Sequence, residues 1–440
     1  MYLKMSNDYL AKKDYSTITI EPKIGSVTNY NNPTFIAIND SIYEFIKECD
    51  GTKTYEDIIE VMSERYIDVT REILRDDFDK VKDFFLEQEI LAETKEYQVS
   101  SDIYREFIDS FVPTNVSLEV TNQCQLKCKH CLNSYDNIDS IESRFMSLER
   151  IKKLMGLCVT YNIQSVFITG GEPFLHPEIK KILEESCKNF NKVTIATNGF
   201  IIISDELCTS LSNYNTTVQI SIDGNKDYHN LFRGNKLSYY NAYKNIDKLI
   251  AYGISVQISY TVNQRNFNFL EDEVIKAKKR GVTSFNIGST SQLGNALENN
   301  IKPLNIYDFT QKSLELCKKY SNEHFAVGLE CTMDELEVII NKNKENNKCG
   351  AGTKIVHVCS NFDVVPCPSM CDLKIGEDFD INFEKILKAD NTLQYTLIQS
   401  PSRELCNGCT LDFQCGGCIG NMLEKVKNDE CQIYQYSDLL

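Results

Sequence analysis

Three cysteines stand close together in the segment TNQCQLKCKHC, where Cys124, Cys128 and Cys131 form a C-x-x-x-C-x-x-C array after a strand-like run. A tight loop with three thiolates offers three corners of a 4Fe–4S cube and leaves the fourth iron open to an added ligand. Structural zinc sites normally use four protein ligands, so the array suits zinc less well. His130 lies between two cysteine positions, from which the loop cannot readily aim it at the same metal. The spacing therefore favours an iron–sulfur cluster.

Short polar motifs follow three later strand-like runs: TGGEP after the second, TNG after the third and SIDG after the fourth, with HNLFRG further on. Adjacent glycines allow the backbone to approach a ligand closely. In parallel β/α folds, ligands bind at the carboxyl ends of the strands, which is where these motifs fall. The candidate ligand-binding residues in them are Gly170, Gly171, Glu172, Pro173, Asn198, Ser221, Asp223 and Arg233.

Strand-like and helical runs alternate from Thr114 to about Asn300, and they supply the elements that would position these motifs. Six strand candidates, NVSLEVT, SVFITG, KVTIAT, TVQISID, SVQISYTV and SFNIGS, are separated by helical stretches such as LERIKKLMGLCVTY. Six such repeats predict an α/β fold with a parallel sheet, either a partial TIM-like barrel or a doubly wound sheet.

The cysteine array, its position and the order of the motifs resemble the radical S-adenosylmethionine (SAM) superfamily. The resemblance implies a partial (β/α)6 TIM-like barrel over residues 112–300, in which SAM chelates the open iron and is cleaved to a 5′-deoxyadenosyl radical. It assigns the methionine ammonium to the GGEP segment with Glu172 and the ribose to the SIDG segment. It also assigns the methionine carboxylate to Arg233, a task that suits a guanidinium fork, and adenine to backbone near His130.

Cysteines are dense again towards the end of the sequence, between residues 349 and 431. This pattern resembles the SPASM extension of peptide-modifying radical SAM enzymes, here over residues 346–440, which houses two auxiliary 4Fe–4S clusters. Phe362 replaces the usual glycine, and the last close pair is spaced C-x-x-C, a form also found among thioether-forming maturases. The resemblance assigns Cys349, Cys367 and Cys418 to the first cluster, and Cys406, Cys409, Cys415 and Cys431 to the second.

The first auxiliary cluster lacks an obvious fourth ligand in the sequence. Cys331, Cys359 and Cys371 are the candidates, or the iron is open to a substrate thiolate. Because paired C-x-x-C motifs also suit tetrahedral zinc, a zinc ribbon is the alternative. The upstream array favours clusters over zinc.

Residues 1–95 predict a separate winged-helix module, with strand-like runs at 16–22, 24–30 and 35–40 before three helical patterns. Thr54 is placed to cap the second helix. The module resembles the leader-recognition domain of peptide-maturing enzymes, in which the leader adds a strand to a sheet edge. That resemblance places the leader-binding groove between residues 35–39 and 71–87. The alternative is that the module is a dimerisation domain. Residues 301–345 predict a helical connection.

The charge and composition of the chain argue against nucleic-acid-binding and membrane proteins. The 440 residues carry a formal net charge of −16, which argues against nucleic acid because phosphate binding needs a basic face. No apolar run has membrane-spanning length and the first residues lack a signal-peptide core, so we expect a cytoplasmic protein without a membrane partner. The sequence contains 18 cysteines. In the cytoplasm, clustered cysteines more often bind metal than form disulfides.

Together the resemblances imply a radical SAM maturase of a ribosomally synthesised peptide, most like the sactipeptide and ranthipeptide synthases. The expected partners are a precursor peptide, with leader and core, and an external electron donor such as flavodoxin or ferredoxin. The expected reaction joins a cysteine sulfur to a carbon of the core. The alternatives are a carbon–carbon cross-link, epimerisation or oxidation to formylglycine, and, in another class, a zinc-binding peptide scaffold.

Overall fold

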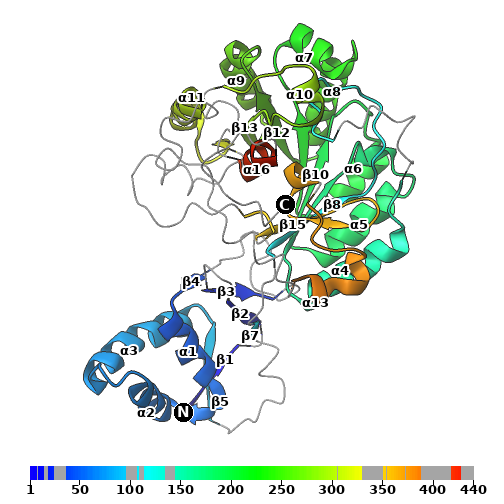
Figure 1. Cartoon of the computed structure of the whole chain (residues 1–440). Coiled ribbons are helices and arrows are strands. Elements are labelled where there is room, and N and C mark those ends of the chain that lie inside the picture. Colours follow the sequence, from blue (N-terminus) through cyan, green and yellow to red (C-terminus); the bar gives the residue numbers. More distant parts are fainter. Residues whose placement is uncertain are drawn as a thin grey trace. The chain divides into compact units, whose positions relative to one another are not determined.

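The structure is a computed structural model, and its chain divides into two compact units, Met1–Val112 and Pro113–Leu440, which are described separately (Figure 1). The residues that it describes are 1–6, 8–13, 18–23, 36–95, 107–108, 113–133, 144–304, 306–329, 350–352, 354–371, 373–387 and 418–427.

The first unit combines two small sheets with three helices. One sheet has the order β5-β1-β6 and the other β4-β3-β2-β7. The strands are β1 (Tyr2–Met5), β2 (Tyr9–Lys13), β3 (Ile18–Pro22), β4 (Ile36–Ile38), β5 (Asp50–Thr54), β6 (Leu91–Thr94) and β7 (Phe107–Ile108), and the helices are α1 (Asp40–Glu48), α2 (Tyr55–Arg65) and α3 (Arg71–Glu87).

Each helix of this unit begins at a capping side chain and buries one apolar face. Thr54 and Asp57 form a capping box at the start of α2, which confirms the predicted cap. Phe45 of α1 stacks on Phe78 of α3 with ring centroids 4.7 Å apart, and both rings are buried. Aromatic packing of this kind holds the helices together.

The predicted strands of this unit agree only in part with the structure. The run at 16–22 contains β3 and the run at 35–40 contains β4, whereas 24–30 lies outside the described residues. Strands β1, β2, β5, β6 and β7 were not predicted, because none is longer than five residues and, in addition, β1 pairs with β5 and β6, which lie far away in the sequence.

The second unit is built on a sheet of nine strands in the order β14-β13-β12-β11-β10-β9-β8-β15-β16. Its strands are β8 (Asn115–Glu119), β9 (Ser165–Thr169), β10 (Lys192–Thr197), β11 (Thr216–Ser221), β12 (Ser255–Val262), β13 (Ser284–Ser289), β14 (Ala326–Leu329), β15 (Ile355–Val358) and β16 (Val364–Val365). All neighbours are parallel except β15 and β16. The six predicted strands are β8 to β13, and the α/β fold class with a partial barrel is confirmed.

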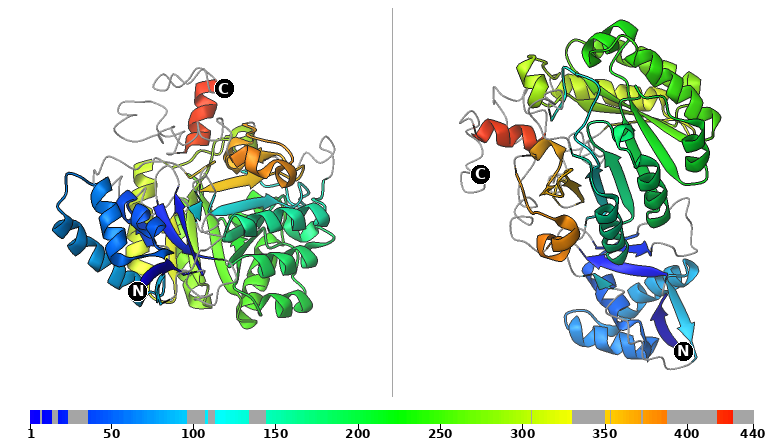
Figure 2. Two further views of the ribbon diagram at one scale, coloured as in Figure 1. Left: turned by 90° about the horizontal axis from the view of Figure 1, so that it is seen from below. Right: turned by 90° about the vertical axis from the view of Figure 1, so that its right-hand side faces the viewer.

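Helices connect these strands and cover one side of the sheet, whereas the C-terminal segments lie on the other side (Figure 2). The connecting helices are α4 (Leu148–Thr160), α5 (Ile179–Asn189), α6 (Asp205–Leu211), α7 (Lys226–Arg233), α8 (Ser238–Ala251), α9 (Leu270–Arg280), α10 (Gly294–Glu298) and α11 (Ile306–Tyr320). The C-terminal segments on the other side are η5 (Pro368–Met370) and α16 (Ile419–Lys427), whereas α13 (Phe379–Leu387) packs against α4, where the ring centroids of Tyr161 and Phe383 lie 5.0 Å apart.

The parallel strands are apolar because both of their faces are covered. Ile168, Ile195, Ile220, Ile258 and Ile287, one from each of β9 to β13, are fully buried. The stretch 301–345, expected to be a helical connection, contains α11 but also β14, which adds a seventh strand in sequence order. Among the described residues, no helix combines the length and the apolar character needed to cross a membrane.

Candidate active site

A cavity of about 400 Å³ lies at the carboxyl ends of the parallel strands, a size that suits a small-molecule ligand. The cysteine loop that follows β8 forms one wall, and the ends of β9 to β13 form the others. The predicted site residues that line it are Cys124, Cys128, His130, Cys131, Gly170, Gly171, Asn198, Ser221 and Arg233. The structure thus brings residues from five separate motifs to one cavity.

Glu172 does not line this cavity. Its carboxylate is fully buried and accepts hydrogen bonds from Thr197 Oγ1 at 2.8 Å, Phe174 N at 3.1 Å and Asn198 N at 2.9 Å. Burial raises the pKa of Glu172 to about 7, although these donors oppose the rise. Glu172 therefore ties the turn after β9 to the end of β10. Pro173, which begins the short helix η3 (Pro173–Leu175), is also absent from the cavity wall.

Gly170 and Gly171 let two backbone segments approach each other. A Cβ on Gly171 would lie 2.3 Å from the Gln123 carbonyl oxygen, and one on Gly170 would lie 2.4 Å from that of Thr121. Gly171 N donates to Thr121 O at 2.8 Å, and Glu172 N donates to Gln123 O at 2.7 Å. The glycines line the cavity, and the close approach that requires them is to the cysteine loop.

The three cysteines of the array are free, and each is partly buried. Burial raises the pKa of the Cys124 thiol to about 11 and that of Cys128 to about 12, so metal binding must displace their protons. In the part of the chain that the structure describes, no three His, Cys, Asp or Glu side chains are already gathered as a metal site. Three thiols on one cavity wall nevertheless fit the donor set of a 4Fe–4S cluster with an open iron.

Arg233 and Asp223 form a buried ion pair behind the cavity wall. Arg233 Nε donates to Asp223 Oδ2 at 2.7 Å, and Asp223 Oδ1 accepts from Thr261 N at 3.2 Å. Burial alone would raise the pKa of Asp223, but the Arg233 guanidinium holds it below its usual range. Arg233 lines the cavity and Asp223 does not, so Asp223 orients the arginine.

The His130 ring lies flat on Phe232, with centroids 4.4 Å apart and an interplanar angle of 3°. Burial lowers the pKa of His130 to about 4, so the imidazole is neutral at physiological pH. Its Nδ1 is buried and finds no hydrogen-bond partner among the described residues, which leaves one polar atom on this wall available to a ligand.

Several residues of the cavity wall escaped the sequence analysis: Gln219, Ser259, Thr261, Ser289, Thr290, Ser291, Pro368 and Ser369. Those from β11 to β13 lie at or near strand ends, and that position was the one available signal. Pro368 and Ser369 come from η5, some 240 positions after the cysteine array, and no local pattern in the sequence links them to it.

Of the predicted auxiliary ligands, only Cys367 and Cys418 are among the described residues. Cys367 precedes η5 and Cys418 precedes α16, and these two elements are packed together: a Cβ on Gly420 would lie 2.6 Å from the Ser369 carbonyl oxygen. Cys349, Cys406, Cys409, Cys415 and Cys431, together with the fourth-ligand candidate Cys331, lie outside the described residues.

Phe362, which replaces the glycine usual in the SPASM pattern, keeps a backbone conformation that favours glycine. Its φ is 67°, in the turn between β15 and β16, and its side chain is buried. The Arg150 guanidinium lies over its ring, 3.7 Å from the centroid, and donates to Asp380 Oδ2 at 3.0 Å and to Asp378 Oδ1 at 2.7 Å. Arg150 thus links α4 to this turn and to the start of α13.

Comparisons with known proteins agree with this arrangement. The model of the "Radical SAM superfamily" matches residues 118–272, and that of "Coenzyme PQQ synthesis protein D (PqqD)" matches residues 27–91. The Bacillus subtilis antilisterial bacteriocin subtilosin biosynthesis protein AlbA is 26% identical over 396 residues, which cover 87% of this chain and 84% of AlbA. The sporulation killing factor maturation protein SkfB of the same organism is 30% identical over 192 residues, 43% of this chain and 46% of SkfB.

Solved structures share the fold. Streptococcus suis SuiB bound to its precursor peptide SuiA superposes with a TM-score of 0.68 at 15% identity, over 98% of this chain and all of SuiB. AdoMet-bound anSMEcpe gives a TM-score of 0.54 at 17% identity, over 70% of this chain and 86% of that chain. The chain therefore joins a PqqD-type domain to a radical SAM domain, the class that uses SAM and a 4Fe–4S cluster, and it is related to AlbA and SkfB.

Proposed function

We propose that this protein is a radical SAM maturase that forms cysteine-to-carbon thioether links in a ribosomally synthesised peptide. The observation that carries the proposal is the cavity in which the three thiols of Cys124, Cys128 and Cys131 face polar strand ends and Arg233. The relatives AlbA and SkfB, named for the biosynthesis of a bacteriocin and the maturation of a killing factor, support a peptide as the substrate.

The residues of the chain divide the work of binding the cofactors. Cys124, Cys128 and Cys131 would hold the 4Fe–4S cluster, which when bound supplies the electron that cleaves SAM to a 5′-deoxyadenosyl radical. Arg233, held in place by Asp223, would bind the methionine carboxylate, and Ser221 would contact the ribose. Because Glu172 uses both carboxylate oxygens inside the fold, we assign the methionine ammonium to backbone around Gly170 and Gly171 rather than to Glu172.

The PqqD-type domain would bind the leader of the precursor. Strand β4 lies at one edge of its sheet, and α3 presents exposed Ile73 and Phe84. A leader added to that edge needs few specific side chains, and it keeps the core peptide at a high local concentration near the radical.

Thioether formation requires that two electrons and two protons leave the peptide. The target carbon would lose a hydrogen atom, which carries one electron and one proton, the cysteine thiol would lose the second proton, and the second electron would leave the peptide as the C–S bond forms. Cys349, Cys367 and Cys418 would hold one auxiliary 4Fe–4S cluster, and Cys406, Cys409, Cys415 and Cys431 would hold a second; when bound, such clusters would supply electron-transfer chemistry. Flavodoxin or ferredoxin would exchange electrons with the protein from outside.

The test has two stages. Anaerobically reconstituted protein with SAM and dithionite should yield 5′-deoxyadenosine. Co-expression with short cysteine-bearing peptides encoded near its gene should then give a product that has lost two hydrogens per link. An unchanged peptide mass together with an inverted residue would indicate an epimerase, and a protein with zinc but no iron would be a scaffold.

A further inference from the structure

The loop that carries the cysteine array has an outer side, which packs against α7. Lys129 N donates to Phe232 O at 2.9 Å. A Cβ on Gly234, directly after α7, would lie 3.0 Å from the Lys127 carbonyl oxygen. Lys127 and Lys129 flank Cys128, which lines the cavity at the strand ends. A molecule that rests on this outer side therefore lies close to the place where the cluster would be held.

Two further segments pack on α7 beside this loop. Phe232 forms an apolar cluster with Ala296 and Ile301 of the segment that contains α10. The ring centroids of Tyr228 and Phe269 lie 5.9 Å apart, which joins the turn after β12 to the same helix. The cysteine loop, α7, the turn after β12 and the α10 segment thus share one surface.

Cations outnumber carboxylates on this surface. The segments that form it are residues 124–133, 226–240, 263–269 and 293–302. Their exposed or partly exposed cations are Lys127, Lys129, Lys226, Lys236, Arg265 and Lys302. Asp227 and Glu298 are the carboxylates of the same segments. The local excess of positive charge is opposite in sign to the net charge of −16 on the whole chain.

Exposed apolar side chains lie among these cations. Leu231 is 65% exposed, Leu237 56% and Tyr240 61%. Asn230 Nδ2 donates to Lys236 O at 2.8 Å, which folds the chain after α7 back against the helix and brings these side chains together. We call the surface formed by the six cations and these three apolar side chains the α7 face. Such a combination suits a transient contact, because weak electron-transfer complexes bury less than about 1,200 Å².

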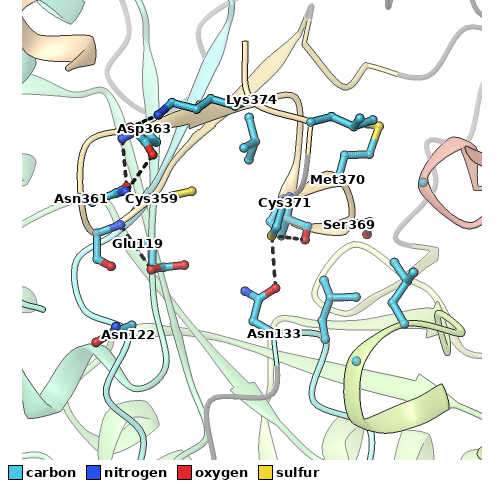
Figure 3. A pocket seen from close by; sticks show the side chains of 18 of the residues that line it. Glu119, Asn122, Asn133, Cys359, Asn361, Asp363, Ser369, Met370, Cys371 and Lys374 are labelled. Atoms are coloured by element: carbon cyan, nitrogen blue, oxygen red, sulfur yellow. Dashed lines mark hydrogen bonds and ion pairs between the residues drawn. The ribbon is translucent and has the colours of Figure 1, made fainter. Parts of the chain in front are cut away.

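The cations of the α7 face are not neutralised by carboxylates. None of the six forms an ion pair within the part of the chain that the structure describes. Elsewhere in this unit cations are paired: Lys276 Nζ lies 2.6 Å from Glu273 Oε1. At a second cavity, of about 520 Å³, Lys374 Nζ lies 2.9 Å from Asp363 Oδ1 (Figure 3). Unpaired cations attract an acidic partner, whereas paired ones do so much less.

We propose that the α7 face docks an acidic one-electron carrier protein, which supplies the electron that SAM cleavage consumes. The inference rests on the proposed function and adds to it the docking surface and the charge of the donor. At the contact the carrier is oxidised by one electron and the cluster held by the cysteine array is reduced by one, and no bond forms or breaks. Complementary charge speeds the encounter, and the thin loop keeps the path short.

Carbodiimide crosslinking tests docking without relying on turnover, because it joins a carboxylate directly to a lysine amine. The probes are an acidic flavodoxin and an acidic ferredoxin, both oxidised, each mixed with the reconstituted protein at low ionic strength. The expected result is that at least one carrier becomes joined to Lys127, Lys236 or Lys302. Carriers joined only to lysines outside the α7 face would overturn the inference. So would α7-face lysines that are joined only to a second copy of the chain or to the precursor peptide.

Charge reversal gives a second readout. The double variant Lys236→Glu/Lys302→Glu should raise the Kd of the oxidised carrier by about tenfold at low ionic strength and by less at high ionic strength. The matched control is Lys192→Glu/Lys279→Glu, which changes the net charge equally at two exposed lysines, one at the start of β10 and one near the end of α9. The control should keep the wild-type Kd.

The source of electrons separates docking from chemistry. Formation of 5′-deoxyadenosine with limiting reduced carrier should slow in the α7-face variant, whereas formation with dithionite, which needs no docking surface, should stay at the wild-type rate. Equal losses of carrier affinity in both double variants, or an equal loss of rate with dithionite, would overturn the inference. A wild-type protein that forms 5′-deoxyadenosine with dithionite but binds neither carrier would also overturn it. A wild-type protein inactive with dithionite would refute the proposed function instead.

Discussion

Arg233 Nε donates to Asp223 Oδ2 at 2.7 Å, and both side chains are buried at the wall of the cofactor cavity. The resemblance of the sequence motifs assigns the methionine carboxylate to Arg233 and the ribose to the SIDG segment that contains Asp223. In the folded protein they act together, because a buried guanidinium needs a counter-charge to stay in place.

Asp223→Asn should destabilise the protein and weaken SAM binding together. Removing one partner of a buried ion pair costs about 3–5 kcal/mol in the free energy of unfolding. Chemical denaturation and a SAM binding titration measure the two effects. The control is Asp205→Asn, because Asp205 is 75% exposed where it meets Lys248 Nζ at 2.7 Å and should matter by less than about 1 kcal/mol. Equal losses in both variants would contradict the role given to Asp223.

Phe362 offers a test of backbone strain. At its φ of 67°, alanine is disfavoured relative to glycine, so Phe362→Ala should be less stable than Phe362→Gly by about 1 kcal/mol. The control is Phe78, buried in the middle of α3, where the order should reverse because glycine weakens a helix by about 1 kcal/mol. Both comparisons use the free energy of unfolding. The same order at both positions would show that the turn conformation does not decide the effect.

The buried Glu172 predicts a pH dependence of stability. Its folded pKa of about 7 lies above the ordinary value of 4.5, so the folded state holds the proton more tightly than the unfolded state. Its contribution is therefore largest below pH 4.5 and is lost as the pH rises through 7. Glu172→Gln should flatten the decline in unfolding free energy between these values. If the free energy of unfolding of the variant declined as steeply with pH as that of the wild type, groups other than Glu172 would cause the decline.

The two groups of cysteines should separate by phenotype. Cys124→Ala should abolish 5′-deoxyadenosine formation, because only two thiolates remain for the cluster. Cys409→Ala should keep some SAM cleavage and lose peptide modification. Cys187→Ala, a change at a partly buried cysteine outside both groups, should retain wild-type iron content and both activities. Full peptide modification by Cys409→Ala would remove the case for the second auxiliary cluster.

Removal of the first unit should uncouple SAM cleavage from substrate capture. The unit extends to Val112 and includes β7, which pairs with β2. The deletion should therefore cover residues 1–112 rather than 1–95. SAM cleavage should persist, whereas processing of the leader-bearing precursor should slow, since the core loses its high local concentration. Processing of a leaderless core at high concentration is the control. An unchanged rate with the full precursor would refute leader binding by this unit.

Motif order along the chain determined much of the site. The carboxyl ends of successive parallel strands meet at one edge, so Cys124, Gly170, Asn198 and Ser221 could be expected in one cavity from strand positions alone. The same local logic identified β8 to β13, whose apolar runs reflect burial on both faces. Recognition of the cysteine spacing needed no tertiary information, because the loop is only eight residues long.

Only the tertiary structure decided which motif residues face the ligand. Glu172 and Asp223 turn inward because their carboxylates accept hydrogen bonds from other elements, from Thr197 of β10 and from Arg233 of α7. Ser369 lines the cavity at the strand ends, and its short helix η5 packs on α16, a contact between segments that no local pattern connects. Periodicity and spacing describe neighbours along the chain, whereas these contacts depend on how distant segments share one buried volume.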